Sequence, residues 1–426
     1  MVSIVPHRLA LPLLLLLLLP PGPMAPGAAR ADAPTPDAAA ATSSAASLFD
    51  EVWRLTDEKF YDPHFNGRDW AAIGARYRPL ALAAGSESAR AEIINRMLAE
   101  LGASHIGFYT REDRAYYDLA DIFSGALRHE LPRVFPKGEV AYEGIGVLTR
   151  KTDDKVFIIG LLDGFPAAAA GLKTGDEIVA ADGASFGEVS SFAGREGQAV
   201  ALTIRRSADG PTQEIAVTPV RIRPNQAYEK AIDASVRIIE KEGRKIGYIR
   251  MWSYARRGYQ DTFETQISSG KLKDADALIW DLRDGWGGAQ PSYLDIFDPR
   301  APQMAVTGRN GETEIVNARW RKPVVLLVNG GSRSGKEVLA YGFKKYGFGP
   351  VVGTRTKGDV LAATAFMLSD GSLLELPVED VRVDGERLEG VGVAPTVEVP
   401  FAPEYSAGTD PQLDRAVEIA AHALHG

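Results

Sequence analysis

A loop rich in glycine and serine, Asn329 through Glu337, separates an apolar strand-like run from a helical pattern. One chemistry for this loop is phosphate binding, because a Gly-x4-Gly-Lys run ends at Lys336. However, Glu337 stands where that motif needs a Mg²⁺-binding hydroxyl, and it would place a negative charge beside the phosphates. The other chemistry is acyl transfer by Ser334, since a helix N-terminus favours developing negative charge. Serines also cap helices without any catalytic role, so the assignment depends on partners elsewhere in the chain.

A serine nucleophile needs a general base within reach and a carboxylate that orients the base. Ser104 and His105 lie where a helical pattern gives way to a strand, a junction at which a side chain can be aimed. Glu389 lies in a turn bounded by glycines, and Glu386 is a nearby competitor for the carboxylate. The residue types therefore allow a Ser-His-Glu arrangement, although a lone histidine is more often structural.

A second glycine-rich turn follows the apolar run that ends at Asp281 and Leu282. Glycine lets backbone N–H groups approach a ligand closely. We expect the N–H of Gly287 or Gly288 to pair with that of Gly335, directly after Ser334, as an oxyanion hole. The alternative is an ordinary turn.

Composition excludes several classes of protein. The chain has 426 residues, a formal net charge of −8 and no cysteine, which excludes disulfides, thiolate metal sites and a cysteine nucleophile. A mildly acidic chain is a poor candidate for non-specific nucleic-acid binding. We therefore expect no nucleic-acid partner; the oligomeric state is open.

The N-terminus is typical of a secretory signal peptide over residues 1–31. A leucine run, Leu13 to Leu19, is too short for a membrane-spanning helix, and the small residues Ala29 and Ala31 bound a cleavage site. We expect export to the periplasm or the medium, with no stable membrane span after cleavage. Residues 32–47 are predicted to be a flexible leader.

Hydrophobic periodicity divides the rest into an α/β multidomain protein. We expect an N-terminal helical domain over 48–130, a β-rich module over 141–222, an α/β domain over 228–403 and a C-terminal helix over 410–426. Within the first of these, Ser88 is expected to cap a helix over 89–101, and a strand is expected over 106–110. The three groups of candidate catalytic residues thus come from widely separated parts of the chain.

Taken together, the motifs resemble the serine peptidases that include carboxy-terminal processing proteases and the tricorn core protease. The resemblance runs from about Phe49 to Pro400. Its most specific parts are the stretch Phe165 to Ile178, the Asn-x-x-Ser-x-Ser-x-x-Glu box that contains Ser334, and the closing motif after Glu389. It implies a ClpP/crotonase-like α/β catalytic core, an inserted PDZ domain and an N-terminal helical segment.

The resemblance also implies how the serine is activated. Processing proteases of the Ser–Lys type carry a lysine where gapless counting from Ser334 reaches Asp359, and Lys357 lies two positions early. The tricorn branch uses a Ser-His pair instead, which Ser104 and His105 match, with Glu389 as the distal carboxylate. We therefore expect His105 to activate Ser334, with no metal and no cofactor.

The PDZ domain implied by the resemblance would bind a peptide carboxylate through backbone N–H groups of Gly144, Ile145, Gly146 and Val147. The expected activity is hydrolysis of protein or peptide amide bonds through an acyl-enzyme. Two alternatives remain open: a Ser334–Lys357 dyad, and a catalytically dead scaffold that binds peptides.

Overall fold

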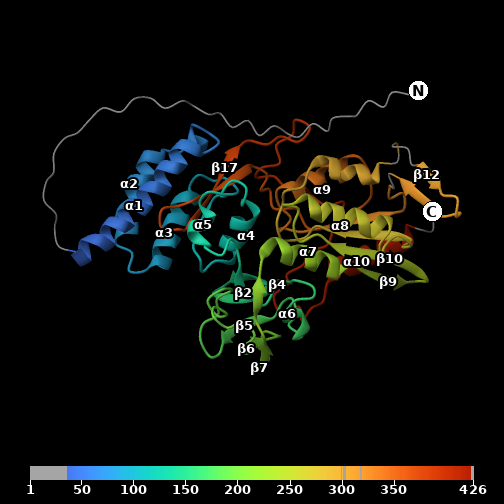
Figure 1. Cartoon of the computed structure of the whole chain (residues 1–426), viewed down its shortest axis with the longest axis horizontal. Coiled ribbons are helices and arrows are strands. Elements are labelled where there is room, and N and C mark those ends of the chain that lie inside the picture. Colours follow the sequence, from blue (N-terminus) through green and yellow to red (C-terminus); the bar gives the residue numbers. More distant parts are fainter. Residues whose placement is uncertain (1–35, 299, 301–303, 317–318, 424–426) are drawn as a thin grey trace.

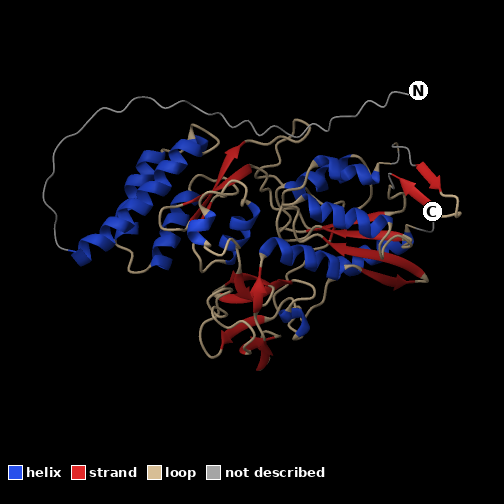
Figure 2. Ribbon diagram, viewed as in Figure 1, coloured by secondary structure: helices blue, strands red, loops and turns tan. Residues whose placement is uncertain are grey.

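The computed structural model describes residues 36–298, 300, 304–316 and 319–423, which form helical, β-rich and α/β regions (Figures 1 and 2). The expected signal peptide and the first four residues of the leader lie outside the described residues. Within the described ranges, no helix combines the length and apolarity that a membrane span requires. The mixed α/β architecture expected from the sequence is confirmed.

The N-terminal region is a group of helices. They are α1 (Pro36–Lys59), η1 (Phe65–Gly67), α2 (Trp70–Leu82), α3 (Glu87–Ala99), α4 (Arg114–Ile122) and α5 (Leu131–Val134). The prediction of a flexible leader through residue 47 is wrong for its later part. Helix α1 already begins at Pro36, because the leader is rich in alanine, and Ala45 is buried at its inner face. The cap of α3 is Ser86, which accepts from Ala89 N–H, and not Ser88.

The β-rich module contains a five-stranded antiparallel sheet in the order β3-β4-β5-β6-β7 and a separate pair, β2 with β8. Its elements are β2 (Tyr142–Gly144), β3 (Val147–Thr152), β4 (Lys155–Leu161), α6 (Pro166–Ala169), β5 (Glu177–Ala181), β6 (Val200–Arg205), β7 (Thr212–Val217) and β8 (Val220–Ile222). Alternating side chains of β6, buried on one face, pack into the module's own hydrophobic core.

The α/β region is built on a six-stranded sheet in the order β18-β15-β14-β11-β10-β9, parallel except for β9. Its strands are β9 (Arg237–Lys241), β10 (Arg244–Arg250), β11 (Ala277–Asp281), β14 (Val324–Val328), β15 (Val351–Gly353) and β18 (Val397–Glu398). The other elements are α7 (Pro224–Ser235), α8 (Arg257–Ser268), η2 (Pro291–Phe297), β12 (Met304–Thr307), β13 (Thr313–Val316), α9 (Gly335–Lys345) and α10 (Pro411–His422). Strands β11 and β14 are buried along their whole length, as parallel strands covered on both faces are.

Another sheet joins the N-terminal region to a segment late in the sequence. Strand β1 (Gly107–Tyr109) pairs antiparallel with β17 (Leu373–Glu379), which pairs with β16 (Ala362–Met367). Figure 1 shows β17 beside the N-terminal helices, although its residues follow the α/β sheet in sequence. Residues 362–379, expected within the α/β domain of 228–403, therefore lie in a sheet shared with the N-terminal region. This pairing brings the segment before β1 to the segment before β16.

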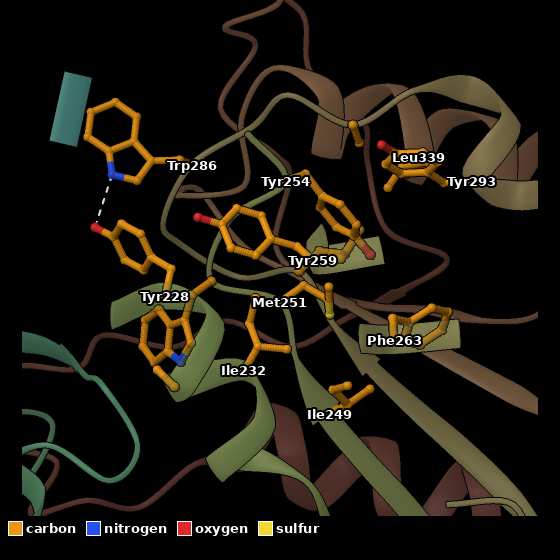
Figure 3. Packing of buried hydrophobic residues seen from close by; sticks show 14 of the residues in the cluster. Tyr228, Ile232, Ile249, Met251, Tyr254, Tyr259, Phe263, Trp286, Tyr293 and Leu339 are labelled. Atoms are coloured by element: carbon orange, nitrogen blue, oxygen red, sulfur yellow. Dashed lines mark hydrogen bonds between the residues drawn. The ribbon is translucent and has the colours of Figure 1, made fainter. Parts of the chain in front are cut away.

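The largest buried cluster connects the regions with aromatic side chains (Figure 3). Trp286 is 7% exposed, and its Nε1 donates to Tyr228 OH at 3.1 Å and to Asp118 Oδ2 at 3.1 Å. Helix α4, helix α7 and the glycine-rich turn after β11 are thus tied together at one indole. The turn is consequently anchored to both helices.

Candidate functional site

Ser334 lies between β14 and α9, as the N-cap of that helix. Its backbone has φ 57° and ψ −131°, a conformation that costs free energy for a residue with a side chain and persists only when the surroundings impose it. Fully buried Glu337 accepts from Ser334 N at 3.2 Å, from Gly358 N at 2.7 Å and from Asp359 N at 2.8 Å. The strained serine is therefore fixed by the first turn of its own helix and by the loop after β15.

Ser104, His105 and Glu389 form a continuous hydrogen-bonded chain. Ser104 Oγ donates to Glu389 Oε2 at 2.8 Å, and Ser104 Oγ lies 3.0 Å from His105 Nδ1. A hydroxyl has one proton, and it is used on the carboxylate, so Oγ accepts from Nδ1–H. This assigns the neutral tautomer in which His105 Nε2 is the acceptor. His105 itself has a positive φ of 52°.

The loop at residues 359–361 connects this chain to Ser334. Ser334 N donates to Asp359 O at 2.7 Å, and the next residue, Val360, donates its N–H to Glu389 Oε2 at 2.7 Å. The same carboxylate accepts from Ser104 N at 2.9 Å, although the two residues are 285 positions apart. The structure thus brings the predicted serine, histidine and glutamate to one place. No hydrogen bond joins Ser334 Oγ to His105 within the described residues, as is common before substrate binds.

The environment of His105 keeps its imidazole neutral. Burial, first, and the positive charges of Arg333 and Lys357 lower its pKa from 6.5 to about 4, while the charge of Asp359 opposes the shift. The neutral form is the one that can accept a proton. Because its charge lowers the pKa of His105, the guanidinium of Arg333 is close enough to the imidazole to act on it electrostatically.

The turn after β11 packs directly on the serine. A Cβ on Gly287 would lie 2.4 Å from Ser334 Cβ and 2.9 Å from Gly335 N, so no side chain fits there. Gly287 O accepts from Tyr254 N at 3.0 Å, which turns the carbonyl away. Within the described part of the chain, the N–H groups of Gly287, Gly288 and Gly335 have no acceptor. These are the three groups expected as oxyanion donors, and Gly287 and Gly335 adjoin Ser334.

Two lysines near the serine differ sharply in environment. The Lys357 side chain is 45% exposed and forms an ion pair with Asp359, whereas a lysine base needs burial that favours the neutral amine. Lys336 is fully buried, and its Nζ donates to the carbonyl oxygens of Asp284 and Trp252. Burial lowers the pKa of Lys336 to about 7. A lysine directed into the protein in this way opposes the phosphate-loop alternative.

The four residues expected to bind a peptide lie at the start of the β-rich module. Gly144 ends β2, Ile145 is buried, Gly146 has φ 78°, and Val147 begins β3. The carbonyls of Ile145 and Gly146 accept from Ala167 N and Leu162 N at 2.9 and 2.8 Å. The turn is therefore tied to the start of α6.

Two cavities border residues 333–335. One, of about 610 Å³, is lined by Ser334, Gly288 and Gly335. Its apolar lining includes Leu294, Val338, Tyr341, Phe348, Val360, Val381 and Val383. The other, of about 500 Å³, lies between β3 of the module and the α/β region, and it reaches Arg333 and Lys357. Sequence reasoning missed the positions of Arg333 and Lys336, because nothing local shows which way their side chains point. No group of metal-ligating side chains occurs among the described residues.

Comparisons with known proteins find two peptidase models that match parts of the chain. Residues 245–399 match the model of peptidase family S41, and residues 43–99 match that of the tricorn protease C1 domain. Tricorn protease homolog 1 of Streptomyces coelicolor is 27% identical over 398 residues, 88% of this chain. The carboxyl-terminal-processing protease of Picosynechococcus sp. is 26% identical over 428 aligned residues, 96% of this chain.

The lengths of these relatives differ. The chain spans 35% of the Streptomyces protein but 94% of the Picosynechococcus protein. Among solved structures, the tricorn protease superposes with a TM-score of 0.55 at 20% identity, over 90% of this chain and 37% of that one. Mature CPAF complexed with lactacystin superposes with a TM-score of 0.52 at 14% identity, over 90% of this chain and 99% of that one. At these identities the likeness shows the fold.

Proposed function

We propose that this protein is a serine endopeptidase that hydrolyses protein or peptide amide bonds through an acyl-enzyme, since residues 245–399 match the model of peptidase family S41. The observation that carries the proposal is the hydrogen-bonded chain from Glu389 through Ser104 to His105. A single peptide group links this chain to Ser334, because Asp359 O accepts from Ser334 N and Val360 N donates to Glu389. An imidazole in the tautomer of a base and a strained serine at a helix N-terminus are the two groups that acyl transfer requires.

In the proposed reaction, Ser334 Oγ attacks the carbonyl carbon of the scissile bond while His105 Nε2 takes its proton. The imidazolium then gives that proton to the leaving amine as the C–N bond breaks. Water, deprotonated by the same imidazole, attacks the ester and releases Ser334. Ser104 Oγ and the Glu389 carboxylate hold Nδ1 and stabilise the transient positive charge on the ring.

The oxyanion of the tetrahedral intermediate would bind to Gly335 N–H together with Gly287 N–H or Gly288 N–H. One such donor is typically worth about 3 kcal/mol of barrier. The turn that holds Gly287 is fixed from behind, because Lys336 Nζ donates to Asp284 O and Tyr254 N donates to Gly287 O. Pre-organised donors of this kind do not reorganise during the reaction.

The cavity that contains Ser334 is the candidate site for the substrate side chain next to the scissile bond. Its lining of Leu294, Val338 and Phe348 suits an apolar side chain. We further propose that residues 141–222 are a PDZ domain that captures a substrate C-terminus around Gly144–Val147. At the edge of β3, Thr149 N donates to Glu188 Oε1 at 2.8 Å, so a peptide strand that adds there must displace this carboxylate.

Export to the periplasm or the medium remains part of the proposal, on the strength of the pattern over residues 1–31. Sequencing the N-terminus of the protein purified from its host tests the expected cleavage before residue 32. An N-terminus upstream of residue 32 on the purified protein would contradict cleavage at the expected site.

The decisive experiment is labelling of the full-length and the residue-32 mature forms with a fluorophosphonate, read by intact mass. Ser334→Ala and His105→Ala should lose labelling, while Lys357→Ala should keep it because that side chain is exposed and ion-paired. Loss of labelling in Lys357→Ala with retention in His105→Ala would establish the lysine dyad instead.

The scaffold alternative has its own signature in the same experiment. The folded wild-type protein would then remain unlabelled, with or without an added peptide that carries a free C-terminus, and it would bind that peptide. Such a result would indicate a peptide-binding protein without hydrolase activity. Added peptide is the necessary control, because the Glu188 contact described above closes the edge of β3.

A further inference from the structure

The cavity between the β-rich module and the α/β region is lined by an unusual number of cations. They are Arg114, Arg150, Arg250, Arg283, Arg333 and Lys357. Five of the six have carboxylate partners: Arg114 with Asp118 and Glu188, Arg150 with Glu404, Arg250 with Asp284, Arg283 with Asp281 and Asp410, and Lys357 with Asp359. Among the described residues, Arg333 alone in this lining forms no ion pair. Arg333 is therefore the cation of this lining whose guanidinium is left without a direct carboxylate partner in the described part of the chain.

The guanidinium of Arg333 is held in one place. Its Cζ lies 3.9 Å from the centroid of the Trp286 ring, and its Nε donates to Gly285 O at 3.1 Å. Trp286 is itself fixed by hydrogen bonds to Tyr228 and Asp118, the first of which is drawn in Figure 3. The two amino groups of the guanidinium have no hydrogen-bond partner within the described ranges. Their planar fork matches the two oxygens of a carboxylate.

This group lies at the active centre. Arg333 directly precedes Ser334, and its charge is the leading electrostatic contribution, after burial, to the low pKa of His105. Two carboxyl groups of this region form no ion pair with it: Asp359 is paired with Lys357, and buried Glu375, which feels the charge of Arg333, is hydrogen-bonded by Tyr109 OH at 3.3 Å. A substrate that enters from the cavity must therefore pass an unpaired, oriented cation.

We propose that Arg333 is a specificity residue that binds a carboxylate of the peptide substrate, presented from the cavity between the module and the α/β region. The inference rests on the proposed peptidase function. The carboxylate has two possible sources: an aspartate or glutamate side chain near the scissile bond, or the C-terminal carboxylate of a substrate cleaved close to its end. Both have the same chemistry, and the experiment separates them.

The test uses the peptide of denatured casein that the wild-type protein cleaves fastest, synthesised as an internally quenched substrate. Each acidic residue is replaced in turn by its amide, and the C-terminus is made as acid or amide. We expect Arg333→Gln to lower kcat/KM roughly 10- to 100-fold for the carboxylate form. The variant should lose nothing more when the critical carboxylate becomes an amide, because the two changes remove one interaction.

The control variant is Arg150→Gln, which removes another cation of the same lining that already has a partner, and it should change kcat/KM less than about twofold. Arg333→Lys keeps the charge without the fork and should fall between the wild type and Arg333→Gln. An equal loss on every peptide, or no loss on any, would overturn the inference.

Fluorophosphonate labelling at pH 8 separates this inference from the proposed function. The reagent has no carboxylate and needs only Ser334, the base and the oxyanion donors, so Arg333→Gln should still be labelled at Ser334. If the wild type does not label, the peptidase proposal fails. Fluorescence anisotropy of fluorescein-labelled acid and amide peptides, with the wild-type and Arg333→Gln proteins, then tests the role of Arg333 by itself. Equal affinities of the wild-type protein for the acid and the amide peptide would contradict that role.

Discussion

Removal of the Ser104 hydroxyl is the most direct test of the proposed base. Ser104→Ala deletes two hydrogen bonds, one to His105 Nδ1 at 3.0 Å and one to Glu389 Oε2 at 2.8 Å, while it leaves Ser104's backbone bond to Glu389 in place. The bond to the ring becomes charge-assisted when the imidazolium forms, and such a bond is worth about 2–3 kcal/mol. Since 1.36 kcal/mol is tenfold in rate, kcat/KM should fall roughly 30- to 150-fold.

The assay is fluorophosphonate labelling and peptide cleavage at pH 8, with thermal unfolding as the check on folding. Ser104→Thr retains a hydroxyl at the same position and should recover most of the activity. The double variant with Glu389→Gln should lose little more than the stronger single variant, because the two residues act through one chain. A Ser104→Ala protein within about threefold of the wild type, or fully additive losses, would refute the relay.

Three further predictions follow from the same geometry. The labelling rate should keep its full value well below pH 6.5 and fall only toward pH 4, since the neutral imidazole of His105 is required and its pKa is lowered to about 4, first by burial; a midpoint near 6.5 would contradict the environment described. Gly287→Ala should lower kcat 100-fold or more while the protein stays folded, because its Cβ would meet Ser334 Cβ at 2.4 Å and displace the oxyanion donors; unchanged kinetics would exclude Gly287 from that role. Burial lowers the pKa of Lys336 from an ordinary 10.5 to about 7, so between these pH values the unfolded chain binds one more proton than the folded protein, and the free energy of unfolding rises with pH. Lys336→Met should remove this rise in urea titrations at pH 7 to 10. An identical pH dependence of the free energy of unfolding in both proteins would refute the prediction.

The sequence placed several chemical groups without help from the fold. Ser334 was recognisable because a glycine- and serine-rich loop between a strand and a helix is a local pattern. Ser104, His105 and Glu389 were each found in junctions or turns, and the structure brings all three into one hydrogen-bonded chain. Hydrophobic periodicity predicted the α/β character of residues 228–403. Errors occurred at boundaries, as in the leader, where alanine-rich sequence continues as helix α1.

The tertiary structure decided matters that depend on distant segments. Only the pairing of β1 with β17 explains why Ser104 reaches a carboxylate 285 positions away, since no local pattern encodes strand partners. Burial separates the two lysines, for Lys357 is exposed and Lys336 lies under the turn that contains Gly287. The composition of the chain determined which groups were available: serine, histidine and carboxylate, with no thiol. Packing determined their protonation, orientation and neighbours, because desolvation and hydrogen bonding are properties of the folded surroundings and not of the residue type.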